Sequence, residues 1–256
     1  MKLLLENGAE VNAEGGWYGN ALQAASFGTN EVIVKLLLAN GACVNAQGGW
    51  YGNALQAATD SFQDNAAIVK LLENGAEVNA EGGQYGNALQ AASLKGDEAI
   101  VKLLLENGAR VNAEGGRYGN ALQAAAASYK DNAAIVELLL ENGADINAEG
   151  GEHENALHAA LFMNNEAIVK LLLWNGAEVN AEGGPGEYYE NALKAAYAHG
   201  NEAIMKLLLT AAQEWHTDDV MTSLYECYLP QYKTVDSGYS LFLEPLRFED
   251  EAEKWS

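Results

Sequence analysis

Cysteine is scarce in this chain, and its scarcity excludes two classes of protein. The 256 residues include 2 cysteines, Cys43 and Cys227, which lie far apart in sequence. Two thiols are too few for the disulfide framework of a small secreted domain, and their separation fits no metal-ligand spacing. Thiols kept reduced are typical of the cytosol and the nucleus. The sequence therefore predicts an intracellular protein, with no metal and no cofactor.

Basic residues are scarce as well. The chain has 14 lysines and arginines against 36 aspartates and glutamates, a formal net charge of -22. Such a chain repels phosphate groups, and no basic stripe interrupts the negative field. This balance excludes nucleic acid and anionic membrane as partners. It favours a basic partner, or a cationic or neutral ligand.

Long apolar runs are also missing. The apolar stretch at the start of the chain, Leu3 to Leu5, is too short for a signal peptide. No other stretch approaches the ~20 apolar residues that a membrane helix needs. Almost half of the residues are nevertheless apolar, 49%, which is enough to fill a core.

The chain does contain an internal repeat. The phrase V-N-A-E-G-G-x-Y-G-N-A-L-Q-A-A recurs with spacings of 33, 34, 33, 35 and 36 residues, and I-V-K-L-L-L-E-N-G-A follows later in each unit. A fixed period of this length predicts a solenoid, which grows by stacking units rather than by enlarging one core. The asparagines that mark the copies are Asn20, Asn53, Asn87, Asn120, Asn155 and Asn191.

These phrases resemble the ankyrin repeat. The resemblance is carried by G-A-D-I-N at residues 143–147, by the L-L-L-x-N-G-A ends and by the period near 33, with N-A-L-Q where the family has T-P-L-H. The G-G-x-Y-G-N-A-L-Q-A-A variant is similar to repeats of large fungal ankyrin proteins. The resemblance implies an all-α ankyrin-repeat solenoid, in which each unit has a short β-hairpin finger and two antiparallel helices.

The repeats divide the chain into three parts. We expect a partial N-terminal repeat over residues 1–10, six ankyrin repeats over 11–210, and a C-terminal capping helix and tail over 211–256. The partial repeat leaves Leu3 and Leu4 on an open stacking face. Repeat arrays normally end in polar capping units. Two explanations stay open: the chain is cut from a longer array, or another molecule, such as a second copy, covers this end.

Helix boundaries can be predicted from three columns of residues. Each marker asparagine precedes Ala-Leu and is expected to cap the first helix, because its side-chain oxygen accepts a free first-turn amide. A second capping column precedes the second helix, and glycines that tolerate a left-handed conformation follow it. The second caps are Asn30, Asn65, Asp97, Asn132, Asn165 and Asn201; the glycines are Gly8, Gly41, Gly75, Gly108, Gly143 and Gly176.

In arrays that resemble this one, partners meet the finger tips and the concave side. Carried over by position, the tips are Trp17, Trp50, Gln84, Arg117, Glu152 and Pro185. Tryptophan and arginine are frequent interface anchors, which favours binding through Trp17, Trp50, Arg117 and Glu152. The alternative is that the two tryptophans only stack on neighbouring fingers.

Two further columns favour structural roles because they recur in nearly every unit. One holds Tyr18, Tyr51, Tyr85, Tyr118, His153 and Tyr189; the other holds Gln23, Gln56, Gln90 and Gln123, where the family's histidine ties loops together. An acidic column, Glu14, Gln47, Glu81, Glu114, Glu149 and Glu182, predicts a negative ribbon along the fingers. Solvation alone also explains such a ribbon.

The residues after Ala-Ala vary most, and units two and four have two extra residues there. Variable loops with an aromatic residue favour partner contact, whereas gap filling between helices explains them equally well. The aromatic residues concerned are Phe27, Phe62, Tyr129 and Phe162.

Unit five departs furthest from the pattern. It has His153 and Glu154 in its finger and His158 in the glutamine column, and Tyr197 and His199 follow in unit six. Imidazoles beside carboxylates are what acid/base catalysis or a metal site would need. The bland interpretation is that His158 restores the family's structural histidine. No nucleophile elbow, phosphate loop or zinc motif occurs, so the chain is not assigned an enzyme activity.

The leading hypothesis is a protein-interaction module that binds a basic or mixed partner through its finger tips and concave face. The predicted partner-binding residues are Trp17, Trp50, Arg117, Phe27, Phe62, Tyr129, Phe162, Glu152, His153, His158 and Tyr197. One alternative is a small-molecule site or atypical enzyme in the aromatic, histidine and glutamate groove of units four to six. Another is a homodimer formed through the open N-terminal end.

Overall fold

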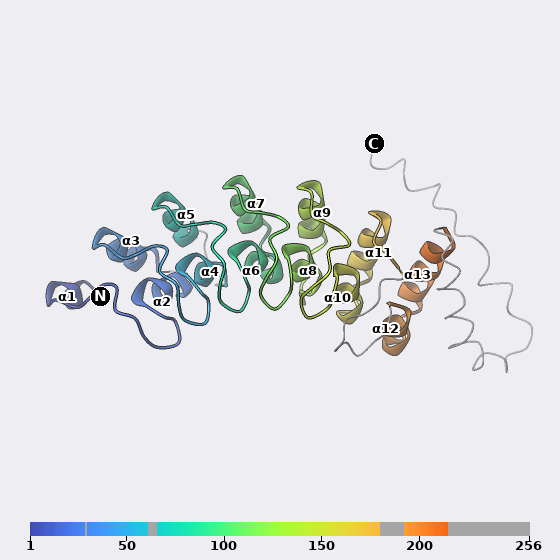
Figure 1. Ribbon diagram of the computed structural model, residues 1–256, viewed down its shortest axis with the longest axis horizontal. Helices are drawn as coiled ribbons and strands as arrows, with labels where there is room; N and C mark the ends of the chain where they lie inside the picture. Colours follow the sequence, from blue (N-terminus) through green and yellow to red (C-terminus); the bar gives the residue numbers. More distant parts are fainter. Residues whose placement is uncertain (29, 61–65, 180–191, 215–256) are drawn as a thin grey trace, which may run out of the picture.

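The computed structural model describes residues 1–28, 30–60, 66–179 and 192–214. Within them, a short helix α1 (Lys2–Glu6) is followed by six antiparallel helix pairs. The pairs stack side by side into two rows, with the inner helices below and the outer helices above in Figure 1. The inner row is α2 (Ala21–Phe27), α4 (Ala54–Thr59), α6 (Ala88–Lys95), α8 (Ala121–Ala126), α10 (Ala156–Phe162) and α12 (Ala192–His199). The outer row is α3 (Glu31–Ala39), α5 (Ala66–Glu73), α7 (Glu98–Glu106), α9 (Ala133–Glu141), α11 (Glu166–Trp174) and α13 (Glu202–Glu214). The predicted solenoid of helix pairs is confirmed.

The inner helices begin where the asparagine column predicted. The side-chain oxygens of Asn20, Asn53, Asn87, Asn120 and Asn155 each accept the amide three residues on. Asn191 lies outside the described residues. Because the cap bond fixes both the start and the direction of each short helix, the six-residue α4 and α8 hold their places without long helical runs.

The second capping column is confirmed at Asn30, Asp97, Asn165 and Asn201. Asn65 lies outside the described residues. The prediction is wrong at Asn132, whose side chain makes no cap bond to α9. In this unit, where the loop is two residues longer, the Asn132 amide donates instead to Ser93 O at 2.8 Å and Ala125 O at 3.3 Å. It therefore ties unit four to unit three.

The core runs between the two rows. Leu, Ile and Val of the outer helices, such as Leu37, Ile68 and Leu104, are buried against inner helices rich in alanine. Small side chains such as Ala91 and Ala124, which are fully buried, let neighbouring inner helices approach closely. Among the described helices, none combines the length and the apolarity needed to cross a bilayer.

The fingers are less regular than hairpins. Four units have one isolated antiparallel bridge each, as between Gly82 and Gly86, and the described residues include no extended strand. Gly82, Gly83 and Gly86 have positive φ angles of 143°, 62° and 91°. Such a backbone cannot continue a β-ladder, so the predicted hairpin is reduced to a single bridge.

Candidate binding surface on the fingers and inner helices

Backbone hydrogen bonds hold the finger tips in register. Each tip amide donates to the tip carbonyl of the preceding unit: Trp50 to Trp17 at 2.9 Å, Gln84 to Trp50 at 3.2 Å, Arg117 to Gln84 at 3.1 Å and Glu152 to Arg117 at 2.9 Å. The five tip side chains therefore project from one continuous backbone ladder.

Glycine makes this close approach possible. A Cβ atom built on Gly83 would lie 2.4 Å from the backbone C and O of Tyr51, and Gly116 and Gly151 would meet Tyr85 and Tyr118 in the same way. No side chain fits at these positions or at Gly49, so the second glycine of the Gly-Gly pair is required by finger-to-finger packing in units two to five. Gly16, in the first unit, meets nothing within 4 Å. The sequence analysis did not identify this role.

The glutamine column anchors each following finger, as predicted. Gln90 Nε2 donates to three carbonyls of the next finger, Ala113 at 3.1 Å, Gly115 at 3.2 Å and Gly119 at 2.8 Å. Gln23, Gln56 and Gln123 repeat the pattern. These buried side chains fix each finger with respect to the inner helix of the unit before it.

Trp17 and Trp50 stack on one another and remain exposed. Their ring centroids are 4.5 Å apart with an interplanar angle of 21°. Exposed fractions are 59% for Trp17 and 43% for Trp50. Stacking and partner contact are therefore compatible at this pair.

The tyrosine column packs beneath the tips, as its regularity predicted. Tyr51 and Tyr85 are buried. Phe27 lies 5.3 Å from Tyr18 and 5.1 Å from Tyr51, ring centroid to ring centroid, so it fills the space between two fingers. Burial, with the Asp60 carboxylate adding to it, raises the pKa of Tyr51 and Tyr85 well above that of a free phenol.

An ionic cluster in the same seam was missed by the sequence analysis. Asp60, at the end of α4, accepts a hydrogen bond from Tyr85 Oη at 2.6 Å and pairs with Lys95 Nζ at 2.5 Å. Asp60 is buried although a carboxylate at a helix C-terminus opposes the helix dipole. The only signal in the sequence was that Asp60 and Lys95 carry opposite charges at nearby positions of adjacent units.

Arg117 and Glu152 form a two-point ion pair across neighbouring tips, through Arg117 Nε and Nη2. The hydrogen bond from Arg117 lowers the pKa of Glu152. The Arg117 guanidinium also lies 5.6 Å from the ring centroid of Tyr118. Tyr129, in the longer loop of unit four, is 95% exposed.

In unit five, two substitutions occur together. In unit four, a Cβ on Gly119 would lie 1.9 Å from Gln123 Oε1. Unit five has Glu154 at the glycine position, with a φ of 60°, and His158 at the glutamine position. Removing the glutamine removes that clash, and His158 is buried on α10 with Asn155 capping its amide. His153 is also buried, 4.8 Å from the ring of Phe162.

These positions bear on the catalytic alternative for units four to six. His153 packs against Phe162 on the finger side, His158 is buried in its helix and His199 is exposed at the end of α12. The described residues contain no cluster of three or more histidine, cysteine or acidic side chains arranged for a metal. The side chain of Tyr197, like Phe62, lies outside the described residues.

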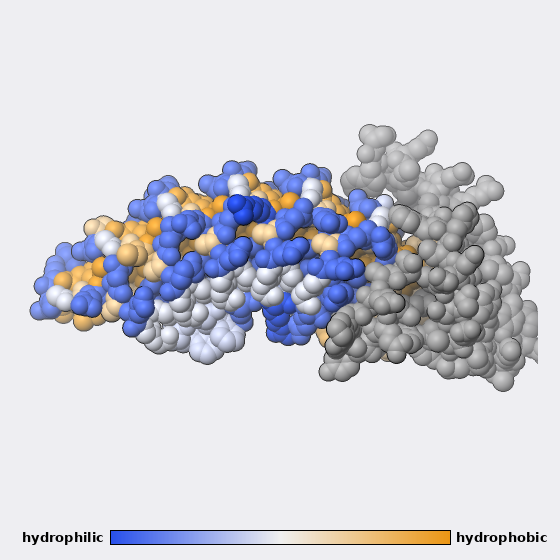
Figure 2. Space-filling view, in the orientation of Figure 1, coloured by the Kyte–Doolittle hydropathy of each residue, from blue (hydrophilic) through white to orange (hydrophobic). Residues whose placement is uncertain are grey.

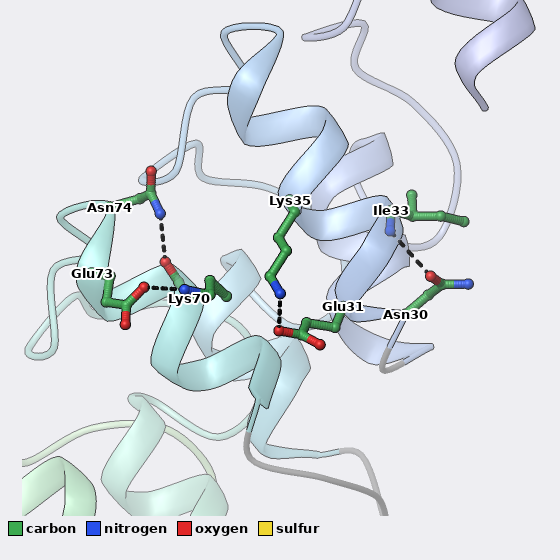
Figure 3. Close-up of polar contacts among 7 residues, drawn as sticks. All are labelled: Asn30, Glu31, Ile33, Lys35, Lys70, Glu73 and Asn74. Carbon is green, nitrogen blue, oxygen red and sulfur yellow. Dashed lines mark hydrogen bonds and ion pairs between the residues drawn. The ribbon is translucent and has the colours of Figure 1, made fainter.

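The negative charge is paired differently on the two sides of the array. On the outer helices, lysines pair with acids of the same helix: Lys35 with Glu31, Lys70 with Glu73 and Lys102 with Glu98. Figure 3 shows the first two on α3 and α5. On the finger arms, Glu14, Glu81, Glu114 and Glu149 are exposed and form no ion pair with any described residue. On the face shown in Figure 2, hydrophilic residues form rows that repeat along the array.

Comparisons with known proteins agree with this architecture. The family model for ankyrin repeats in three copies matches residues 1–82, 63–150, 89–183 and 124–219. The crystal structure of the human ASB11 ankyrin repeat domain is similar at a TM-score of 0.68 and 27% sequence identity, covering 82% of this chain and 90% of that one. The comparison with curated proteins finds no match.

Proposed function

The chain belongs to the ankyrin-repeat family, and from this premise we propose that it is a protein-binding module whose partner contacts the finger tips and the inner-helix seam. Ankyrin repeats generally act as protein-interaction modules. The observation that carries the proposal for this chain is the exposed Trp17–Trp50 stack, held on a hydrogen-bonded ladder.

A rigid exposed tryptophan pair suits an interface for two reasons. Tryptophan buries much area with few rotors to immobilise, which makes it a frequent hot spot. The ladder supplies the preorganisation, because the tip backbones are already fixed before a partner arrives. Two large rings exposed on the tips serve no core, so binding is the role that their exposure supports.

The partner segment is proposed to be basic. Glu14, Glu81, Glu114 and Glu149 on the finger arms form no ion pair with a described residue, in contrast to the acids of the outer helices. Arg110 lines a pocket with Glu81 and Glu114 without pairing with either, so in this net -22 chain the arms keep a negative field. Such a field steers a positively charged segment toward the tips and raises its association rate.

Further anchors are proposed along the same surface. Arg117, Glu152 and Tyr129 are exposed at its centre, and Phe27 and Phe162 border the tyrosine column. His153 and His158 are assigned to the floor, where they support these contacts rather than reach a partner. Phe62 and Tyr197, whose side chains lie outside the described residues, stay predictions as partner contacts.

The experiment is a selection of ligands from a random peptide library on the full chain, followed by affinity measurement on variants. We expect the selected peptides to be basic. Replacing Trp17 and Trp50 together by alanine should weaken binding by at least ~2 kcal/mol, about 30-fold. Trp174→Ala is the matched control, because Trp174 is 51% exposed but lies on the outer helix α11.

One outcome would contradict the proposed site: peptides that bind the double tryptophan variant as tightly as they bind the parent chain would place the site elsewhere. Circular dichroism of each variant shows that the fold is retained. Peptides that survive the double variant but fail on His153→Ala would instead move the binding site to unit five.

The remaining expectations stay proposals. The division into residues 1–10, 11–210 and 211–256 is one of them; α13 continues to Glu214, four residues past the second boundary. A homodimer through the exposed Leu3 and Leu4 is another, which light scattering across a concentration series would test. Intracellular location is a third.

A further inference from the structure

The stacking distance between Trp17 and Trp50 limits what this pair can hold. Their centroids are 4.5 Å apart, whereas a group inserted between two rings needs roughly 3.5–4 Å to each, about 7 Å in all. No ring or rounded ammonium group fits between them. A ligand is therefore confined to the exposed outer surfaces of the pair.

Those surfaces favour a cation. The face of an indole carries the negative part of its quadrupole, and tryptophan is the best side chain for cation–π contact. Glu14, exposed and free of an ion pair with the described residues, belongs to the same finger as Trp17. Charge complementarity selects a positively charged side chain over an apolar or anionic one.

Elsewhere the chain uses its own cations in this way. Lys170 lies 4.3 Å from the ring centroid of Trp174, and Arg117 lies 5.6 Å from that of Tyr118. Over the described part of the chain, no lysine or arginine lies over Trp17 or Trp50. Among the described residues, this exposed aromatic pair of the fingers therefore has no cation over its rings.

Arginine fits this open site better than lysine. A guanidinium is flat, so it can lie parallel to an indole, and it is more weakly hydrated than an ammonium group, which keeps its water shell on an open surface. We propose that the exposed faces of Trp17 and Trp50 bind an arginine side chain of an extended basic segment of the partner, with Glu14 adding to the attraction. This inference rests on the proposed function and names the chemistry of its central contact.

The test uses three labelled synthetic peptides of equal length whose basic positions are all arginine, all lysine or all citrulline. Citrulline keeps the planar shape of arginine and loses its charge. Fluorescence anisotropy with the full chain should show the arginine peptide binding about five-fold more tightly than the lysine peptide, the upper range for one exposed cation–π contact. The citrulline peptide should bind more weakly than both.

Variants locate the preference. Trp17→Ala and Trp50→Ala should each abolish the preference, so that the variant binds the arginine peptide no more tightly than the lysine peptide. Trp174→Ala, whose ring face is already occupied by Lys170, should leave the preference intact. Glu14→Gln should weaken the arginine and lysine peptides equally, because it removes charge without removing a ring.

The outcomes separate this inference from the proposed function. Equal binding of arginine and lysine peptides, lost equally in the tryptophan variants, overturns the arginine preference and leaves the binding module standing. Equal binding of arginine and citrulline peptides overturns the cation. An arginine preference retained in both tryptophan variants overturns the inference and the proposed site together. If no peptide binds, the inference is wrong, and the library selection still decides the proposed function.

Discussion

A methyl group at position 83 would test whether finger-to-finger packing determines the stability of the array. In Gly83→Ala, the new Cβ would lie 2.4 Å from the backbone of Tyr51, at a φ of 62°. The left-handed conformation alone costs an alanine about 1–2 kcal/mol. The collision adds about 1–3 kcal/mol, because two backbones and no flexible side chain must move.

The neighbouring ladder raises the cost further. The tip bond from Gln84 N to Trp50 O, 3.2 Å long, joins the same two fingers, and losing it removes about 1 kcal/mol more. We therefore expect Gly83→Ala to lower the free energy of unfolding by about 3–6 kcal/mol.

Gly75→Ala is the matched control. Gly75 has a φ of 83°, and a Cβ there meets nothing within 4 Å. It should cost only the conformational part, about 1–2 kcal/mol. Urea unfolding followed by circular dichroism measures both variants, with unchanged slopes showing that the denatured states are comparable. Equal losses for the two substitutions would refute the argument, because they would show that the fingers separate at no cost.

Two further predictions concern the seam beneath the tips and the finger of unit five. Burial raises the pKa of Tyr85 above its unfolded value of about 10, so the stabilising contribution of the neutral phenol is complete below that pH and is lost as pH rises. Unfolding at alkaline pH should therefore coincide with the appearance of tyrosinate absorbance, and Tyr85→Phe should shift the midpoint of alkaline unfolding to higher pH. An unchanged midpoint would show that the phenol titrates in the folded state. Glu154→Gly should stabilise the chain by about 0.5–1 kcal/mol, because the glutamate has a φ of 60°. Glu149→Gly, at an exposed arm position without positive φ, should destabilise it, and a melting comparison that finds the same sign for both would contradict the conformational explanation.

The features that the sequence predicted are those determined within one unit or by a strict period. Asparagine caps, helix-ending glycines and the Gln23–Gln123 column depend on local geometry that recurs every 33 to 36 residues, so each copy confirms the others. The cap prediction at Asn132 was wrong for the complementary reason: in a loop with two extra residues, its amide donates to Ser93 O of the preceding unit and to Ala125 O of its own unit.

The features that the sequence did not predict depend on how far apart neighbouring units lie. The tip ladder and the requirement for Gly83 follow from a distance between two backbones that no pattern of residue types records. The Asp60–Lys95 pair joins variable positions at the C-terminal ends of α4 and α6, and no other pair of described units has a counterpart. Periodicity establishes the units and their caps, whereas contacts between non-repeating residues require coordinates.

This division has a consequence for specificity. The ladder that aligns the tips uses only backbone groups, so the tip side chains can differ from unit to unit without loss of register: tryptophan at 17 and 50, arginine at 117, glutamate at 152. The groups that maintain register, by contrast, vary only in concert, as where Glu154 replaces glycine and His158 replaces glutamine in the same unit. The proposed binding groups and the groups that give structural support therefore lie on different atoms of the same finger. A change of partner requires new tip side chains on an unchanged ladder, which is why substitutions at Trp17 or Arg117 should alter binding while leaving the unfolding transition nearly unmoved.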